Sequence, residues 1–69
     1  MEKPYDQLTE REIGILQRLA TGLSDQQIAD ALYLSLNTVK WHNRQIYSKL
    51  GIDSRTQAIG RARELSLIS

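Results

Sequence analysis

The chain of 69 residues contains no cysteine, and it has a single histidine, a single proline and a single tryptophan. Without cysteine neither a disulfide nor a thiolate metal site can form, and one histidine does not make a metal cluster. Apolar runs extend over only a few residues, so we predict no membrane-spanning helix. A catalytic site needs titratable groups that converge in a pocket, and this short chain has few of them. We therefore predict a protein that is not an enzyme, with no cofactor and no metal.

The length of the chain allows one domain at most, and a domain of this size buries only about 60% of the surface that its unfolded form exposes. Residues 1–7, MEKPYDQ, are polar and lack the apolar segment of a signal peptide. We predict a flexible N-terminal segment or linker remnant at residues 1–7 and a folded domain over residues 8–69. A reducing cytoplasm is the expected location.

Charge is distributed unevenly along the chain, although the net charge is only +1. Residues 1–30 contain six acids and three bases, whereas residues 31–69 contain two acids and six bases. This asymmetry favours a surface for an anionic partner, with an ordinary solvated surface as the alternative.

Two capping boxes mark the starts of the first two predicted helices. Thr9 with Glu12 opens a helix in the segment 8–22, and Ser24 with Gln27 opens a helix of about eight residues. Gly14 lies inside the first helix at a cost of ~1 kcal/mol relative to alanine, which either close packing or plain tolerance would explain. The residues expected to face the core are Ile13, Leu16, Ala20, Ile28, Ala29 and Leu32.

Two further cap signals predict a third and a fourth helix. Ser35 caps a helix over residues 36–50 that Gly51 ends, and Ser54 with Gln57 forms a third capping box for a helix at about residues 54–65. No segment has the alternation of a strand, so we predict an all-α fold of four helices. The short connection between the second and third helices is typical of a helix-turn-helix, placed at residues 25–44. The residues of the fourth helix that should face the core are Ala58, Ile59, Ala62 and Leu65.

The third helix has two different faces on a helical wheel of about 100° per residue. Its core side carries Val39, Ile46 and Leu50, and Trp41 lies on the opposite side. Either Trp41 folds onto the stem of a neighbouring cation or under residues 1–7, or it faces a partner surface. Duplex DNA suits the second reading, because Arg and Lys pair with guanine, Asn pairs with adenine and an apolar ring contacts the thymine methyl group. The other residues of this outer side are Asn37, Arg44 and Ser48, with Lys40 and Lys49 at its edges.

Most of the chain resembles the LuxR-type (GerE-like) helix-turn-helix domain of bacterial transcription regulators. The similarity is highly specific in its combination of Thr-Val-Lys-x-His, Lys-Leu-Gly and Arg-Thr-Gln-Ala, and a narrower similarity is to large MalT-like multidomain regulators. The matching segments are LTERE at 8–12, LATGLSDQQIADAL at 19–32, SLNTVKWH at 35–42, IYSKLGIDSRTQAI at 46–59 and ARELSLI at 62–68.

The resemblance implies sequence-specific binding of double-stranded DNA, with the recognition helix, about residues 36–50, in the major groove. Lys40, Trp41 and Arg44 match groove-reading positions, and Thr38 and Lys49 match phosphate contacts. Asn37 is added to these candidate DNA contacts because the helical wheel places it on the same outer side of the third helix. The family resemblance also implies a homodimer on DNA through the fourth helix, while the isolated domain should be a monomer. The candidate dimer contacts on that helix are Gln57, Gly60, Arg61 and Glu64.

Several residues outside this set have structural interpretations. His42 is expected to be a satisfied structural histidine that bridges to the first or second helix. Tyr33 and Tyr47 are expected to cover the core. Arg55 begins the fourth helix, an unfavourable end for a cation, which suggests an acidic partner such as Asp53 or Glu12. Asn43 falls on the inner side of the third helix, where relatives usually carry an apolar residue, and it needs a hydrogen-bond partner or else a tilt toward solvent.

An alternative function is a helical protein-interaction module whose Trp41 face binds a partner such as an RNA polymerase subunit. This alternative explains an exposed tryptophan, but it does not explain Lys40, Arg44 and Lys49 around it without an acid. Salt dependence separates the two, because binding to DNA weakens steeply as salt rises.

Overall fold

The structure, a computed structural model, describes residues 8–67. It contains α1 (Glu10–Ala20), α2 (Asp25–Leu32), α3 (Leu36–Leu50) and α4 (Arg55–Glu64), and no strand occurs in this range. The predicted all-α fold of four helices is therefore confirmed. Two parts of the predictions lie outside the described residues. They are the N-terminal segment at residues 1–7 and residue 68, the last of the matching segment ARELSLI.

Side-chain caps define where the helices begin. Thr9 Oγ1 accepts the Glu12 N–H at 3.1 Å while Glu12 Oε1 accepts the Thr9 N–H at 2.8 Å, which completes the first predicted capping box. The box of α2, formed by Ser24 and Gln27, is equally complete.

The capping box predicted for α4 is only half correct. Ser54 Oγ accepts the Gln57 N–H at 3.2 Å, but Gln57 Oε1 accepts the N–H of Asp53 at 2.8 Å and not that of Ser54. The backbone of Ser54 is more extended than at the other caps, with φ −146° against −73° at Ser24. The Gln57 side chain therefore closes onto the amide one residue earlier.

Left-handed residues end α2 and α3. Gly51, with φ 68°, ends α3 as predicted, because glycine adopts this conformation without a steric cost. Tyr33 ends α2 in the same conformation, with φ 57°, and its side chain is 96% exposed. The prediction that Tyr33 covers the core is wrong, since the left-handed turn directs its side chain into solvent. Tyr47 does pack against the core.

The core surrounds α1, which contacts all three other helices. Ile15, Leu16 and Leu19 are completely buried, whereas Ile13 and Ala20 are only partly buried. The predicted set of core-facing residues of α1 was therefore too small, because a helix packed on several sides buries more of its surface than one face. The other buried core residues are Leu8, Ile28, Ala29, Val39, Ile46, Ala58 and Ala62.

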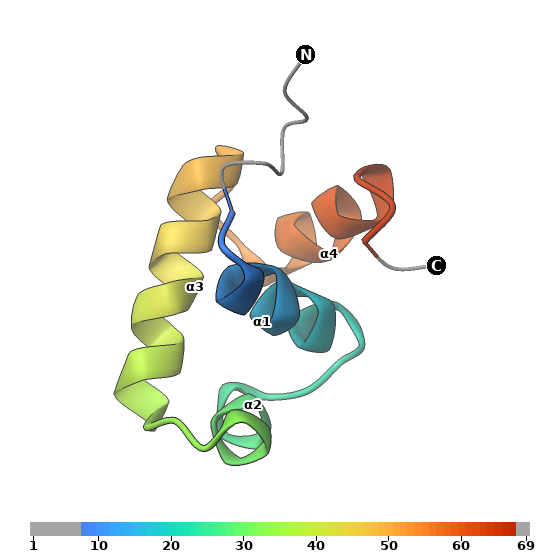
Figure 1. The fold of residues 1–69 in the computed structure, drawn as a ribbon. Helices are drawn as coiled ribbons and strands as arrows, with labels where there is room; N and C mark the ends of the chain where they lie inside the picture. Colours follow the sequence, from blue (N-terminus) through green and yellow to red (C-terminus); the bar gives the residue numbers. More distant parts are fainter. Residues whose placement is uncertain (1–7, 68–69) are drawn as a thin grey trace.

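Figure 1 shows α3 along one side of the molecule, with α1 in the middle, α2 at the N-terminal end of α3 and α4 on the far side of α1. The turn between α2 and α3 spans residues 33–35. One side of α3 packs on the core, and the residues on its opposite side are exposed. This exposed side of α3, which carries Asn37, Lys40, Trp41 and Arg44, is called the outer face below.

Candidate nucleic-acid interface

The outer face of α3 brings together four of the six residues predicted to contact DNA. Asn37, Lys40, Trp41 and Arg44 are all exposed, and the large Trp41 side chain is 49% exposed. Within residues 8–67, no hydrogen bond or ion pair engages the side chains of Asn37, Lys40 or Arg44. Since α3 contains no acid, this surface combines unpaired cations, an amide and an aromatic ring.

The first turn of α3 lies beside this face. Ser35 Oγ accepts the Thr38 N–H at 3.1 Å, and the Ser35 and Thr38 hydroxyls are 2.8 Å apart. The first turns of α1 and α2 contain acids that compensate the positive end of the helix, but the first turn of α3 contains none. An anion at the amino end of α3 therefore meets amide and hydroxyl donors and no opposing charge.

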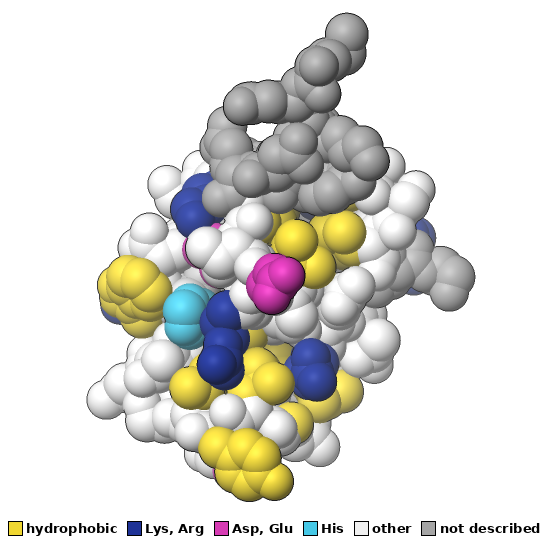
Figure 2. Space-filling view, viewed as in Figure 1, with side chains coloured by type: hydrophobic (Ala, Val, Ile, Leu, Met, Phe, Trp, Pro, Cys, Tyr) yellow, Lys and Arg dark blue, Asp and Glu magenta, His cyan; other side chains and the backbone are white. Residues whose placement is uncertain are grey.

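The Trp41 ring contacts the ring of the next residue. Its centroid lies 5.0 Å from that of His42, with an interplanar angle of 72°, which is an edge-to-face arrangement. Figure 2 shows the histidine at the surface, with hydrophobic atoms on one side and basic atoms on the other. The buried Nδ1 of His42 has no hydrogen-bond partner among the described residues. The expected bridge from His42 to the first or second helix has no hydrogen bond at this atom within residues 8–67, and the imidazole instead contacts Trp41 edge to face.

Lys49 differs from the other predicted DNA contacts. Its Nζ lies 2.7 Å from Oε1 of Glu12, whose side chain is 4% exposed. Burial raises the pKa of Glu12, but hydrogen bonds from Lys49 and Thr9 and the charge of Lys49 outweigh it, so that the pKa lies below its ordinary value. The pair thus joins α3 to the cap of α1, and the predicted phosphate contact of Lys49 stays a prediction. Helical spacing could not reveal a pair separated by 37 positions.

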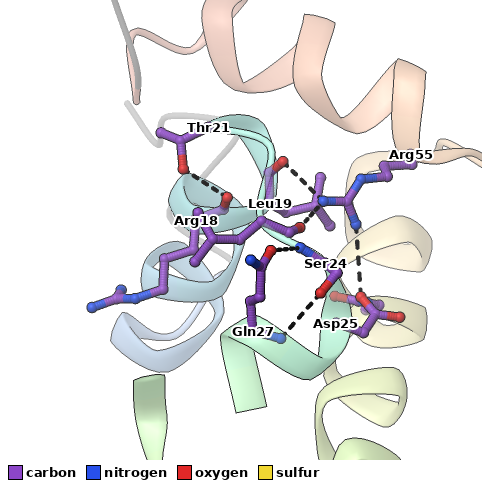
Figure 3. Close-up of polar contacts among 9 residues, drawn as sticks. Arg18, Leu19, Thr21, Ser24, Asp25, Gln27 and Arg55 are labelled. Carbon is purple, nitrogen blue, oxygen red and sulfur yellow. Dashed lines mark hydrogen bonds and ion pairs between the residues drawn. The ribbon is translucent and has the colours of Figure 1, made fainter. Parts of the chain in front are cut away.

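A polar network lies on the inner side of α3. Asn43 is only 8% exposed, as its wheel position predicted, and its Nδ2 donates to Asp25 Oδ1 at 2.9 Å. The same oxygen of Asp25 lies 3.7 Å from Arg55 Nη1. Arg55 also donates through Nη2 to the carbonyls of Leu19 and Leu23, and Figure 3 shows this guanidinium between Asp25 and the end of α1.

The network corrects the expected partner of Arg55. Its acid is Asp25, not Asp53 or Glu12, because Glu12 pairs with Lys49 and the long Arg55 side chain reaches from the start of α4 to the start of α2. Burial raises the pKa of Tyr47, the positive charge of Arg55 lowers it and the negative charge of Asp25 raises it, which leaves that pKa above its ordinary value. Asn43 Oδ1 is buried without a partner within residues 8–67, which costs roughly 1–3 kcal/mol.

The candidate dimer residues gather around one hollow. An open depression of about 420 Å³ lies between the end of α3 and the exposed side of α4, and its lining includes all four predicted contacts. Arg61 Nη1 lies 2.7 Å from Glu64 Oε2, which leaves this side of α4 partly self-paired. Gly60 faces open space, since a Cβ added there meets no atom within 4 Å. The full lining is Leu50, Gly51, Ile52, Gln57, Gly60, Arg61 and Glu64.

The described residues offer neither a metal site nor a membrane-spanning helix. In the part of the chain that the structure describes, no three His, Cys, Asp or Glu residues are grouped so that they could hold a metal ion. The helices in this part are too short or too polar to cross a membrane. The arrangement presents no convergent titratable groups on the outer face, where the exposed side chains are cationic, amide and aromatic.

A short helix, a three-residue turn and a longer helix with an exposed basic and aromatic face define a helix-turn-helix module for nucleic acid. Comparison with known proteins agrees with this class. Residues 6–62 match the GerE family, described as bacterial regulatory proteins, luxR family. The chain belongs to the luxR family of bacterial regulatory proteins, and it is a DNA-binding regulatory domain and not an enzyme.

The relatives are response regulators. The chain is 49% identical over 57 residues to the nitrate/nitrite response regulator protein homolog of Haemophilus influenzae, which covers 83% of this chain and 27% of that protein. It is 47% identical over 64 residues to the response regulator protein VraR of Staphylococcus aureus, covering 93% of this chain and 31% of VraR. These relatives do not test the narrower similarity to MalT-like regulators, which stays a prediction.

A solved structure supports the fold. The crystal structure of the response regulator ChrA, of a heme-sensing two-component system, matches with a TM-score of 0.84 and 55% sequence identity, over 96% of this chain and 33% of the ChrA chain. The chain thus spans about a third or less of the length of the proteins that it matches.

Proposed function

We propose that α3 enters the major groove of duplex DNA and that its outer face reads the bases. Lys40 and Arg44 suit guanine, Asn37 suits adenine, and the Trp41 ring suits the methyl group of thymine. The observation that carries this proposal is the exposed, acid-free outer face, whose polar side chains are not engaged by other described residues. Trp41 contributes little to folding at 49% exposure, so contact with a partner accounts for it better.

Phosphate contacts would position the domain on the duplex. The amino end of α3, with Ser35 and Thr38, offers donors to one phosphate, since its positive end is not compensated by an acid. Lys49 is a weaker candidate, because its ammonium group already pairs with Glu12, although its side chain is 32% exposed.

The proposal is tested by in vitro selection of a preferred duplex, followed by alanine substitutions. Arg44→Ala or Lys40→Ala should each weaken binding to the selected duplex by about 1–3 kcal/mol and relax the base preference at one position. Thr38→Ala should weaken selected and unrelated duplexes about equally, because a phosphate contact carries no base information. An Arg44→Ala variant with the affinity and the site preference of the unmodified domain would show that the recognition face is misassigned.

The stripe of α4 around Gly60 is proposed as the contact between two copies on adjacent half-sites. The absence of a side chain at Gly60 and the hollow beside it allow a second α4 to approach closely. A contact of this size is well below the ~1,200 Å² of a stable interface, so the isolated domain should be monomeric without DNA. Sedimentation that reveals a micromolar dimer in the absence of DNA would contradict this part of the proposal.

The similarity to response regulators suggests the wider context. We propose that the domain works as the DNA-binding part of a longer bacterial regulator, in the cytoplasm and at the nucleoid. Contact with RNA polymerase would then follow from its position at a promoter. Neither role requires chemistry on DNA.

A further inference from the structure

A single carboxylate oxygen connects three helices on the inner side of α3. Asp25 is the first residue of α2, Asn43 lies midway along α3, and Arg55 is the first residue of α4. Asp25 Oδ1 accepts the amide of Asn43 at 2.9 Å and lies 3.7 Å from the guanidinium of Arg55. None of these residues belongs to the outer face, so the proposed interface with DNA does not account for the network.

The surroundings hold the Asp25 carboxylate in place. Arg55 is anchored by its hydrogen bonds to the carbonyls of Leu19 and Leu23, which lie at the end of α1 and in the segment before α2. Figure 3 shows the carboxylate on the α2 side of this guanidinium. Asn43 therefore donates to an acceptor that is itself fixed by two other elements.

The apolar contacts of α3 do not supply the same restraint. Val39 and Ile46 are completely buried on either side of Asn43, but hydrophobic burial has no preferred direction. A hydrogen bond does have one, because it weakens steeply as its angle departs from linearity. Asn43 leaves its buried Oδ1 without a partner among residues 8–67, so the distinctive contribution of this amide is the direction of its hydrogen bond to Asp25.

We infer that Asp25 and Asn43 are positioning residues that fix the rotation of α3 against α2 and thereby set which bases the outer face reads. This inference rests on the proposed function of that face. Functional groups must be held within roughly 10–20° of their productive geometry, and Lys40 and Arg44 lie three positions before and one position after Asn43 on the same helix. A small rotation of α3 would move both away from the base edges while leaving the charge of the surface unchanged.

The test is the substitution Asn43→Val, which removes the hydrogen bond to Asp25 and leaves the pair of Asp25 with Arg55. The ratio of affinity for a selected duplex to affinity for an unrelated duplex should fall about tenfold. The dependence of binding on salt should stay the same, since no cation is lost. The thermal midpoint should stay equal or rise, because the unpartnered buried amide is removed.

Ile46→Val is the matched control, since it loosens the packing of α3 one turn away without touching the network. It should lower the thermal midpoint and leave the affinity ratio within twofold. The inference is overturned if Asn43→Val keeps its affinity ratio, or if Ile46→Val loses it equally, because either result assigns Asn43 to packing alone. If the unmodified domain does not distinguish the two duplexes, the proposed function fails and this inference fails with it.

A second pair of variants tests the acceptor. Asp25→Asn keeps a side-chain oxygen for Asn43 and should retain the affinity ratio within about threefold, whereas Asp25→Ala should lose it about tenfold. Both variants remove the charge that faces Arg55, so equal loss in the two would assign the effect to that ion pair and overturn the positioning role of the hydrogen bond.

Discussion

The two sides of α3 carry different kinds of residue and have different tasks. The inner side buries Val39 and Ile46 completely, and its one amide is hydrogen-bonded to Asp25. The outer face exposes an aromatic ring and cations that have no acidic partner among residues 8–67, and these side chains contribute little to folding. The buried apolar residues of the inner side thus serve stability and the outer face serves recognition, so substitutions of Val39 or Ile46 should change unfolding and those on the outer face should change binding.

The largest expected effect compares one residue from each side of α3. Ile46→Ala should lower the free energy of unfolding by about 3 kcal/mol, because it opens a cavity in a completely buried position. Trp41→Ala should change it by less than about 0.5 kcal/mol. Urea denaturation followed by circular dichroism measures both. If Trp41→Ala proved as destabilising as Ile46→Ala, the separation between the two sides of α3 would not hold.

The next effect concerns Lys49, which lies at the boundary of the two sides. Lys49→Met should destabilise the domain by about 1–3 kcal/mol, because the carboxylate of Glu12 stays buried without its cation. If Lys49 also contacts a phosphate, the variant will reduce the magnitude of the slope of log affinity against log salt by about one. Binding should be measured at a temperature well below the thermal midpoint of the variant, so that it stays folded. An unchanged slope would assign Lys49 to the fold alone.

The Glu12–Lys49 pair also predicts a dependence of stability on pH. The pKa of Glu12 is lower in the folded domain than its ordinary value of 4.5, so the unfolded chain binds this proton more tightly. The stabilisation is therefore complete above about pH 4.5 and is lost as the pH falls through the folded pKa. Glu12→Gln should flatten the decline of the thermal midpoint below pH 4.5, and a decline as steep as in the unmodified domain would contradict the pair.

The smallest effect compares two helical glycines. Gly14→Ala and Gly60→Ala should each raise stability by about 0.5–1 kcal/mol, since a Cβ meets only Arg18 Nη1 at 3.5 Å in the first and nothing within 4 Å in the second. Only Gly60→Ala should weaken binding to two adjacent half-sites relative to one, because only Gly60 lies in the proposed contact between two copies. If both variants had the same ratio of affinity for two adjacent half-sites to affinity for one, that contact would be excluded.

Local signals in the sequence predicted the helices well. The caps at Thr9, Ser24 and Ser35 and the stop at Gly51 act over a few residues, so their chemistry is readable without tertiary information. The rotation of α3 was predictable too, because residues with one buried side follow the helical period. The sequence alone therefore indicates which side of α3 is exposed.

The errors arose where distant segments meet. The burial of Ile15 and Leu19 depends on α1 being packed on several sides, and the partners of Glu12 and Arg55 come from other helices. The inward position of Asn43 was visible from spacing, but its acceptor on α2 was not. Tyr33 is exposed because it adopts a left-handed conformation at the end of α2. This conformation could not be predicted from the sequence, since glycine or asparagine more commonly adopts it.

The central claim is that the outer face of α3 contacts DNA, and the single tryptophan reports on it directly. Mixed-sequence duplex should be titrated into the domain at low and at moderate salt while Trp41 fluorescence is followed. We expect the emission to change on binding and the affinity to fall steeply with salt, because cations on this face displace counterions from the duplex. Emission that stays unchanged at low salt, while a partner protein alters it, would contradict this account and favour a protein-interaction module.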